Sequence, residues 1–236
     1  MAKTREHAGE RRCAYCGGRA FTGDHVVSRA LYPPSSGNSR HRRIKVPACV
    51  SCNNGWSDDE AHFRTVMLLA GDPTPAVREL WDGKVRRSFT QPDGRKRARD
   101  LFNQFVPVTT PDGPRHAIYP GRDERVVRIV RKIVRGLCHH HGLLSPVLDE
   151  QVQADIHRSE VPHEFLAQMT FSHAEESVLQ YRFGVVDEPE IHSGWLLTFF
   201  NRTPFLCIVF RSAAARRQFE ARSVATSEQE MILSNT

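Results

Sequence analysis

The sequence lacks any apolar run long enough to cross a membrane. Its most apolar segment, Trp195 to Phe210, is interrupted by Asn201, Arg202 and Pro204, whereas a spanning helix needs about 20 consecutive apolar residues. The segment from Met1 to Arg12 is polar and charged, and therefore has no apolar core of a secretory signal. These absences exclude a transmembrane helix and predict a soluble, cytoplasmic protein without a membrane partner.

The composition does not show the depletion of apolar residues that marks disordered chains. Hydrophobic residues make up 39% and charged residues 25% of the 236 positions, which is typical of folded globular proteins. The net charge is +6, and the basic residues cluster around positions 40–45 and 95–99. Such clusters attract polyanions through counterion release, and they are also common on solvated faces. Charge alone leaves both interpretations open.

Four of the six cysteines form two Cys-x-x-Cys pairs, Cys13 with Cys16 and Cys49 with Cys52. In a chain without a secretory signal, such pairs indicate a metal site rather than disulfides. Four thiolates are the ligand set of a closed structural zinc site, and two glycines follow Cys16, as in tight knuckle turns. No thioredoxin-like context favours a redox role. The spacing therefore predicts structural Zn²⁺, without which so small and loop-rich a module should not fold.

The other two cysteines stand alone in apolar segments. Free cysteine behaves as a small hydrophobic residue, so Cys138 and Cys207 are predicted to lie in the core. Cys138 precedes three consecutive histidines at positions 139–141. Consecutive residues on a helix point in different directions, and histidine is favourable at a helix C-terminus in any case. We therefore do not interpret this run as a metal site.

The pattern of residues changes near position 66 and predicts an α+β fold in two parts. A small zinc-bound module would occupy residues 1–66, and a mixed α+β domain of unassigned role would occupy residues 67–236. Apolar periodicity and capping residues predict helices at 58–69, 74–81 and 123–140, and a hairpin over 190–211 that turns at 201–204. In the third helix, basic residues occupy the face opposite the apolar one: Arg125, Arg128, Arg131, Lys132 and Arg135.

The segment enclosed by the cysteine pairs carries a more specific signal. It contains Asp24-His25-Val26, and the second pair runs directly into Asn53. The combination Cys-x-x-Cys, Asp-His-Val and Cys-x-x-Cys-Asn resembles the HNH endonuclease superfamily, which has a treble-clef-like ββα-metal fold. The stretch Cys-Asn-Asn-Gly-Trp-Ser-Asp-Asp-Glu is similar to a branch of uncharacterised bacterial HNH proteins. The resemblance covers roughly residues 12–66, about a quarter of the chain.

This resemblance implies a metal-dependent endonuclease that hydrolyses phosphodiester bonds, in double-stranded DNA because the family mostly cuts DNA. His25 would be the general base, and Asp24 and Asn53 would hold one catalytic Mg²⁺ or Mn²⁺, with Asn54 or His62 as alternatives to Asn53. An imidazole titrates near neutral pH, and a hard divalent cation prefers oxygen ligands. The zinc would hold the strand and the helix of this site in register.

The chain departs from the family pattern at two positions. Ile44 stands where HNH proteins usually carry the asparagine that orients the catalytic histidine, and Asn53 replaces the final histidine, a known variant. A plainer interpretation of Asn53 is that it caps a helix starting near residue 57, a role that does not exclude metal binding.

Basic residues that lie between the metal-site elements are the predicted phosphate contacts: Arg29, Arg42, Arg43 and Lys45. Two alternatives to an autonomous nuclease stay open. In one, the module is a non-catalytic zinc ribbon that binds nucleic acid, and Asp24 and His25 are structural. In the other, the module is the nuclease effector of a defence or toxin system and residues 67–236 bind a regulatory protein. A homodimer is a further possible assembly.

Overall fold

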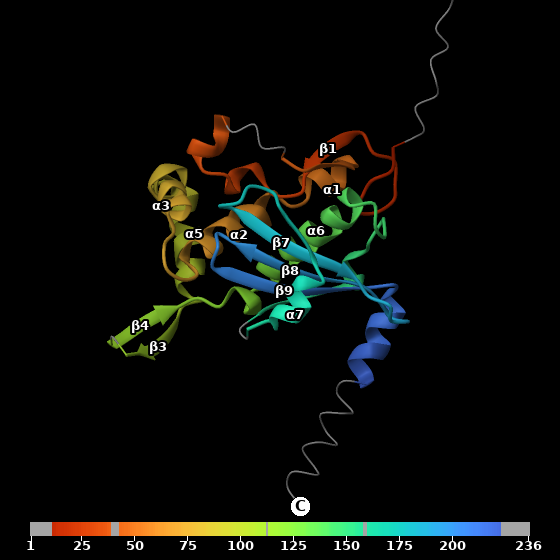
Figure 1. Ribbon diagram of the computed structural model, residues 1–236. Helices are drawn as coiled ribbons and strands as arrows, with labels where there is room; N and C mark the ends of the chain where they lie inside the picture. Colours follow the sequence, from red (N-terminus) through yellow and green to blue (C-terminus); the bar gives the residue numbers. More distant parts are fainter. Residues whose placement is uncertain (1–10, 39–42, 112, 158–159, 223–236) are drawn as a thin grey trace, which may run out of the picture.

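The computed structural model describes residues 11–38, 43–111, 113–157 and 160–222 (Figure 1). Its strands are β1 (Thr22–His25), β2 (Lys45–Ala48), β3 (Val106–Thr110), β4 (Gly113–Ala117), β5 (Val152–Ile156), β6 (Thr170–His173), β7 (Leu179–Val185), β8 (Ile191–Phe199) and β9 (Thr203–Phe210). Its α-helices are α1 (Val50–Asn54), α2 (Ser57–Leu69), α3 (Pro75–Leu80), α4 (Arg86–Ser88), α5 (Pro92–Phe102), α6 (Glu124–His140) and α7 (His163–Ala167). Short 3-10 helices include η1 (Arg29–Leu31) and η2 (Pro34–Asn38), and a further helix runs over residues 213–222. The fold is mixed α+β, as the sequence predicts.

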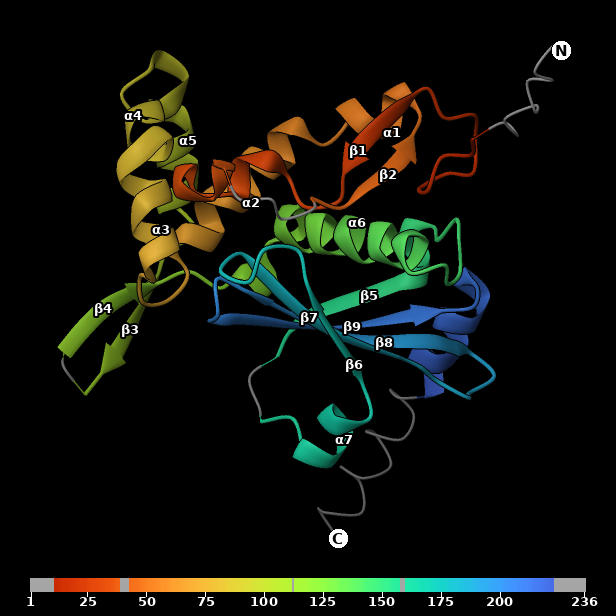
Figure 2. The same cartoon turned by 45° about the horizontal axis from the view of Figure 1, so that its top comes forward.

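Five strands form one antiparallel sheet in the order β5-β9-β8-β7-β6. Along β8 the side chains alternate in burial, so that Ser193, Trp195, Leu197 and Phe199 face the core, as the twofold period of a strand requires. Helix α6 covers this face of the sheet, and α2 and the β1–β2 hairpin lie on the other side of α6 (Figure 2). Helix α6 is therefore the central layer of the molecule.

The elements predicted from local patterns are confirmed. The hydroxyl of Thr74 accepts a hydrogen bond from the Val77 N–H at the start of α3, and the Asp123 carboxylate accepts two N–H groups at the start of α6. The predicted hairpin is formed by β8 and β9, and both lone cysteines, Cys138 and Cys207, are fully buried. Among the described residues, no helix is both long and apolar enough to span a membrane.

The basic face of α6 is only partly open to solvent, with Arg125 exposed and Arg128 half-buried. Lys132 and Arg135 are buried because the N-terminal residues pack over them. The Arg135 side chain donates hydrogen bonds to the carbonyls of Tyr15 and Val147, both at 2.7 Å. Two sides of this helix therefore face the interior.

Helix α6 approaches the N-terminal residues closely at Gly136. A Cβ atom at this position would lie 2.7 Å from a methyl group of Val26, so a larger residue would force a shift. One hydrophobic cluster includes residues from the cysteine-bearing segment, α2, α6 and the sheet. The boundary expected near residue 66 falls inside α2, and the core runs continuously past it.

Candidate metal centre and its surroundings

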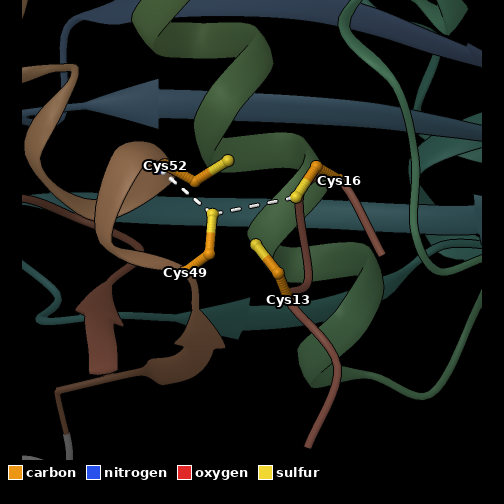
Figure 3. A group of neighbouring side chains, drawn as sticks. All are labelled: Cys13, Cys16, Cys49 and Cys52. Carbon is orange, nitrogen blue, oxygen red and sulfur yellow. Dashed lines mark hydrogen bonds between the residues drawn. The ribbon is translucent and has the colours of Figure 1, made fainter. Parts of the chain in front are cut away.

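The four paired cysteines converge on one point (Figure 3). Their sulfur atoms all lie within 4.8 Å of one another, and the Sγ atoms of Cys16 and Cys49 are 3.8 Å apart. Four sulfurs bound tetrahedrally at about 2.3 Å from a zinc ion are separated by about 3.8 Å. The donor set and its spacing therefore fit a zinc ion, and the cluster can hold one as a structural centre.

Local backbone geometry brings each pair of sulfurs to this point. The Cys13 carbonyl accepts the Gly17 N–H at 2.9 Å, and Gly17 has a φ of +72°, a conformation that glycine adopts without steric cost. Cys49 is the N-cap of α1, and its sulfur accepts the N–H of Cys52 at 3.4 Å. Hydrogen bonds from the Ser51 hydroxyl and the Cys52 N–H lower the pKa of Cys49 to about 6, whereas burial raises the pKa of Cys52. The protein alone therefore favours the thiolate form at Cys49 but not at Cys52.

Asn53 lies inside α1 rather than at the start of α2. Its backbone N–H donates to the Cys49 carbonyl at 3.0 Å, and the N-cap of α2 is Trp56, which makes no side-chain capping bond. The interpretation of Asn53 as a helix cap is therefore wrong. Its side chain is half-buried and makes no hydrogen bond within the described part of the chain, and the neighbouring Asn54 is exposed.

Asp24 belongs to a buried ion cluster that joins three elements. Its Oδ2 atom accepts a hydrogen bond from the Tyr15 hydroxyl at 2.6 Å and lies 2.9 Å from the Lys132 ammonium. Lys132, from α6, also pairs with Glu60 of α2 at 2.6 Å. Burial and the neighbouring Asp24 raise the pKa of Tyr15, which keeps its hydroxyl a donor. The sequence indicated Asp24 as a site residue but not Lys132, because nothing in the helical pattern of α6 shows that Lys132 is buried.

His25, the next residue on β1, faces away from Asp24, as adjacent strand residues do. Burial, together with the positive charges of Lys45 and Arg29, lowers its pKa below the ordinary value. Its Nδ1 atom is buried and has no hydrogen-bond partner among the described residues. The side chain of Ile44 is apolar and buried, so position 44 offers the imidazole no hydrogen-bond partner.

Three of the predicted phosphate contacts lie near His25, whereas one of the alternative metal ligands has a different partner. Arg29, Arg43 and Lys45 lie close enough to His25 for their charges to act on its imidazole. Arg42 lies outside the described residues. His62, an alternative metal ligand, instead bonds through Nε2 to the Asp123 carboxylate at 2.5 Å.

The histidines at the end of α6 have partners other than a metal. His139 lies 2.8 Å from the Ser145 hydroxyl, and His141 lies 2.9 Å from the Tyr181 hydroxyl. The ring of His141 also packs on Phe183. These contacts assign the histidine run to packing between the helix end and the sheet.

No family model, curated protein sequence or solved structure matches this chain.

Proposed function

We propose that this protein is a metal-dependent endonuclease of the HNH type that hydrolyses phosphodiester bonds in DNA, with His25 as its general base. The observation that supports this most is the setting of His25 at the end of β1, where the positive charges of Lys45, Arg29 and Arg43 act on a partly buried imidazole. These cations attract phosphate groups, and they favour the neutral imidazole, which is the form that can accept a proton.

The geometry suggests how the side chains divide the work. Because Nδ1 of His25 is buried, Nε2 is the ring nitrogen that would take a proton from the attacking water. The guanidinium groups of Arg29 and Arg43 would offset the negative charge that grows on the phosphate as the water attacks. Within the described residues the Asp24 carboxylate makes its two contacts through Oδ2, so Oδ1 would be the atom that binds a divalent cation, with Asn53 as the second ligand.

A bound Mg²⁺ or Mn²⁺ would supply charge stabilisation at the leaving oxygen. The zinc held by the four cysteines would have a different task. Cys49 and Cys52 begin α1, and α1 contacts β1, so the zinc centre would keep Asn53 in register with Asp24 and His25.

A second candidate function is a zinc-ribbon module that binds nucleic acid without cutting it. Asp24 forms an ion pair with Lys132 and accepts a hydrogen bond from Tyr15. These contacts favour the alternative, because a structural ion pair accounts for Asp24 without any catalytic metal. The unpartnered Nδ1 of His25 favours it as well, since an unoriented imidazole is a poorer base.

The test compares the full-length protein with His25→Ala and with the control His116→Ala, which removes an exposed histidine from β4. Each purified protein is incubated with supercoiled plasmid in Mg²⁺, in Mn²⁺ and in EDTA, and its zinc content is measured. We expect metal-dependent nicking or linearisation by the wild type and the control, and a rate about 10²- to 10⁴-fold lower for His25→Ala.

Two outcomes would contradict the proposal in different ways. Cutting by His25→Ala at the wild-type rate would show that His25 is not the base. Binding of DNA without hydrolysis by any of the three proteins, with zinc present in each, would establish the non-catalytic alternative.

A further inference from the structure

A cavity of about 480 Å³ lies between the segment that follows β1 and helices α2 and α3. Its size falls within the range of about 300 to 1,000 Å³ that is typical of small-ligand pockets. Arg29 and Arg43, whose charges act on His25, both line this cavity, and Arg64 of α2 lines it as well. The same two arginines therefore line the cavity and act on the proposed catalytic base.

Among the described residues, the three guanidinium groups have no anionic partner. Within the described residues, none of Arg29, Arg43 and Arg64 makes a hydrogen bond or an ion pair, and the Nε atom of Arg64 is buried without a partner. Arg43 lies over the ring of Tyr32, 4.7 Å from its centroid. A buried guanidinium nitrogen without an acceptor is costly, and an anion bound in the cavity would supply one.

Among the described residues that line this cavity, Glu79 carries the one carboxylate, and this group is hydrogen-bonded within the protein. Glu79 accepts hydrogen bonds from the backbone N–H and the hydroxyl of Ser35, at 2.6 and 2.5 Å. The Tyr32 hydroxyl is likewise held, because it donates to the Ala174 carbonyl at 3.0 Å. The cavity therefore presents a surplus of fixed positive charge, and its apolar wall includes Leu80 and Val85.

We propose that this cavity binds a backbone phosphate, with its attached nucleoside, from the nucleic-acid strand that is cut at His25. This inference rests on the proposed function and names the subsite that positions its substrate. Guanidinium groups bind phosphate oxygens through paired N–H donors, and the apolar wall provides a surface for the sugar or base. The contact fixes the position of the strand without reading its sequence.

The test measures binding separately from cutting, in full-length protein that carries His25→Ala so that the substrate is not consumed. Fluorescence anisotropy with a labelled DNA duplex and a labelled single strand compares Arg43→Gln and Arg64→Gln with the control Arg217→Gln. Arg217 is exposed in the helix over residues 213–222, and its replacement removes the same charge. Unlabelled AMP and inorganic phosphate serve as competitors that represent free phosphate esters.

We expect each cavity variant to bind DNA about tenfold more weakly, with the slope of log K against log salt reduced by about 0.9. The control should change affinity by no more than about twofold. Zinc content and thermal unfolding verify that each variant folds. If Arg64→Gln does not fold, Arg29→Gln takes its place beside Arg43→Gln.

Cavity variants that bind DNA as tightly as the control would overturn the inference, whether or not the wild type cuts. It would also be overturned if the variants lost AMP binding but kept DNA binding, because the cavity would then hold a free nucleotide. Loss of DNA binding in a protein that never cuts would support the cavity as a phosphate subsite and would refute only the nuclease proposal.

Discussion

Replacing Lys132 with methionine tests the buried ion cluster at the centre of the molecule. Lys132 is fully buried and pairs with Asp24 of β1 at 2.9 Å and with Glu60 of α2 at 2.6 Å. Methionine retains most of the volume of the lysine side chain but none of its charge. The variant therefore leaves two carboxylates without their counterion while it changes the packing little.

The expected loss follows from the burial of those carboxylates. The side chain of Asp24 is 8% exposed and that of Glu60 is 20% exposed, so neither regains full hydration. Removing one partner of a buried ion pair typically costs about 3–5 kcal/mol. The bond from Tyr15 to Asp24 persists, so we expect a loss near the lower value, about 3 kcal/mol. For a protein of this size that loss corresponds to a decrease in Tm of roughly 6–12 °C.

Urea unfolding followed by tryptophan fluorescence, with zinc in excess, measures this free energy. The control Lys96→Met replaces an exposed lysine of α5 and should change stability by less than about 0.5 kcal/mol. The double variant Asp24→Asn with Lys132→Met should be more stable than Lys132→Met alone, because it removes a stranded charge. A loss below about 1 kcal/mol for Lys132→Met, or no recovery in the double variant, would refute this reasoning.

Two further predictions follow from the cysteine cluster and from His25. Cys49→Ser should reduce the zinc content from about one ion per chain and lower the Tm. Cys138→Ala should keep its zinc, because Cys138 is buried apart from the cluster. Equal zinc contents in the two variants, measured by elemental analysis, would contradict this prediction. Because the pKa of His25 is lowered by burial and by Lys45, cleavage should be lost only below pH 6.5, the ordinary histidine value. Lys45→Gln should move that midpoint of kcat/KM upward, and an unmoved or lower midpoint would count against His25 as the base.

Much of the cysteine cluster could be predicted from the sequence because its geometry is local. Each Cys-x-x-Cys pair closes its own tight turn, and four thiolates have few alternatives to a shared metal. The helices were similarly predictable, because apolar periodicity and caps such as Thr74 and Asp123 depend on neighbouring residues. The alternative interpretation of Asn53 as a helix cap shows where this local reasoning failed, since α1 runs over Val50–Asn54 and already includes Asn53.

The sequence by itself thus determined the four cysteines that can hold a zinc ion, the principal helices and the terminal hairpin, because these depend on residues within a few positions of one another. Only the tertiary structure decided that Lys132 is buried and that Arg29, Arg43 and Arg64 line one cavity. A helical pattern shows which residues share a face, but not what covers that face. The β1–β2 hairpin and α2 cover the basic side of α6, and that long-range packing turns an ordinary charged face into the buried cluster that holds Asp24.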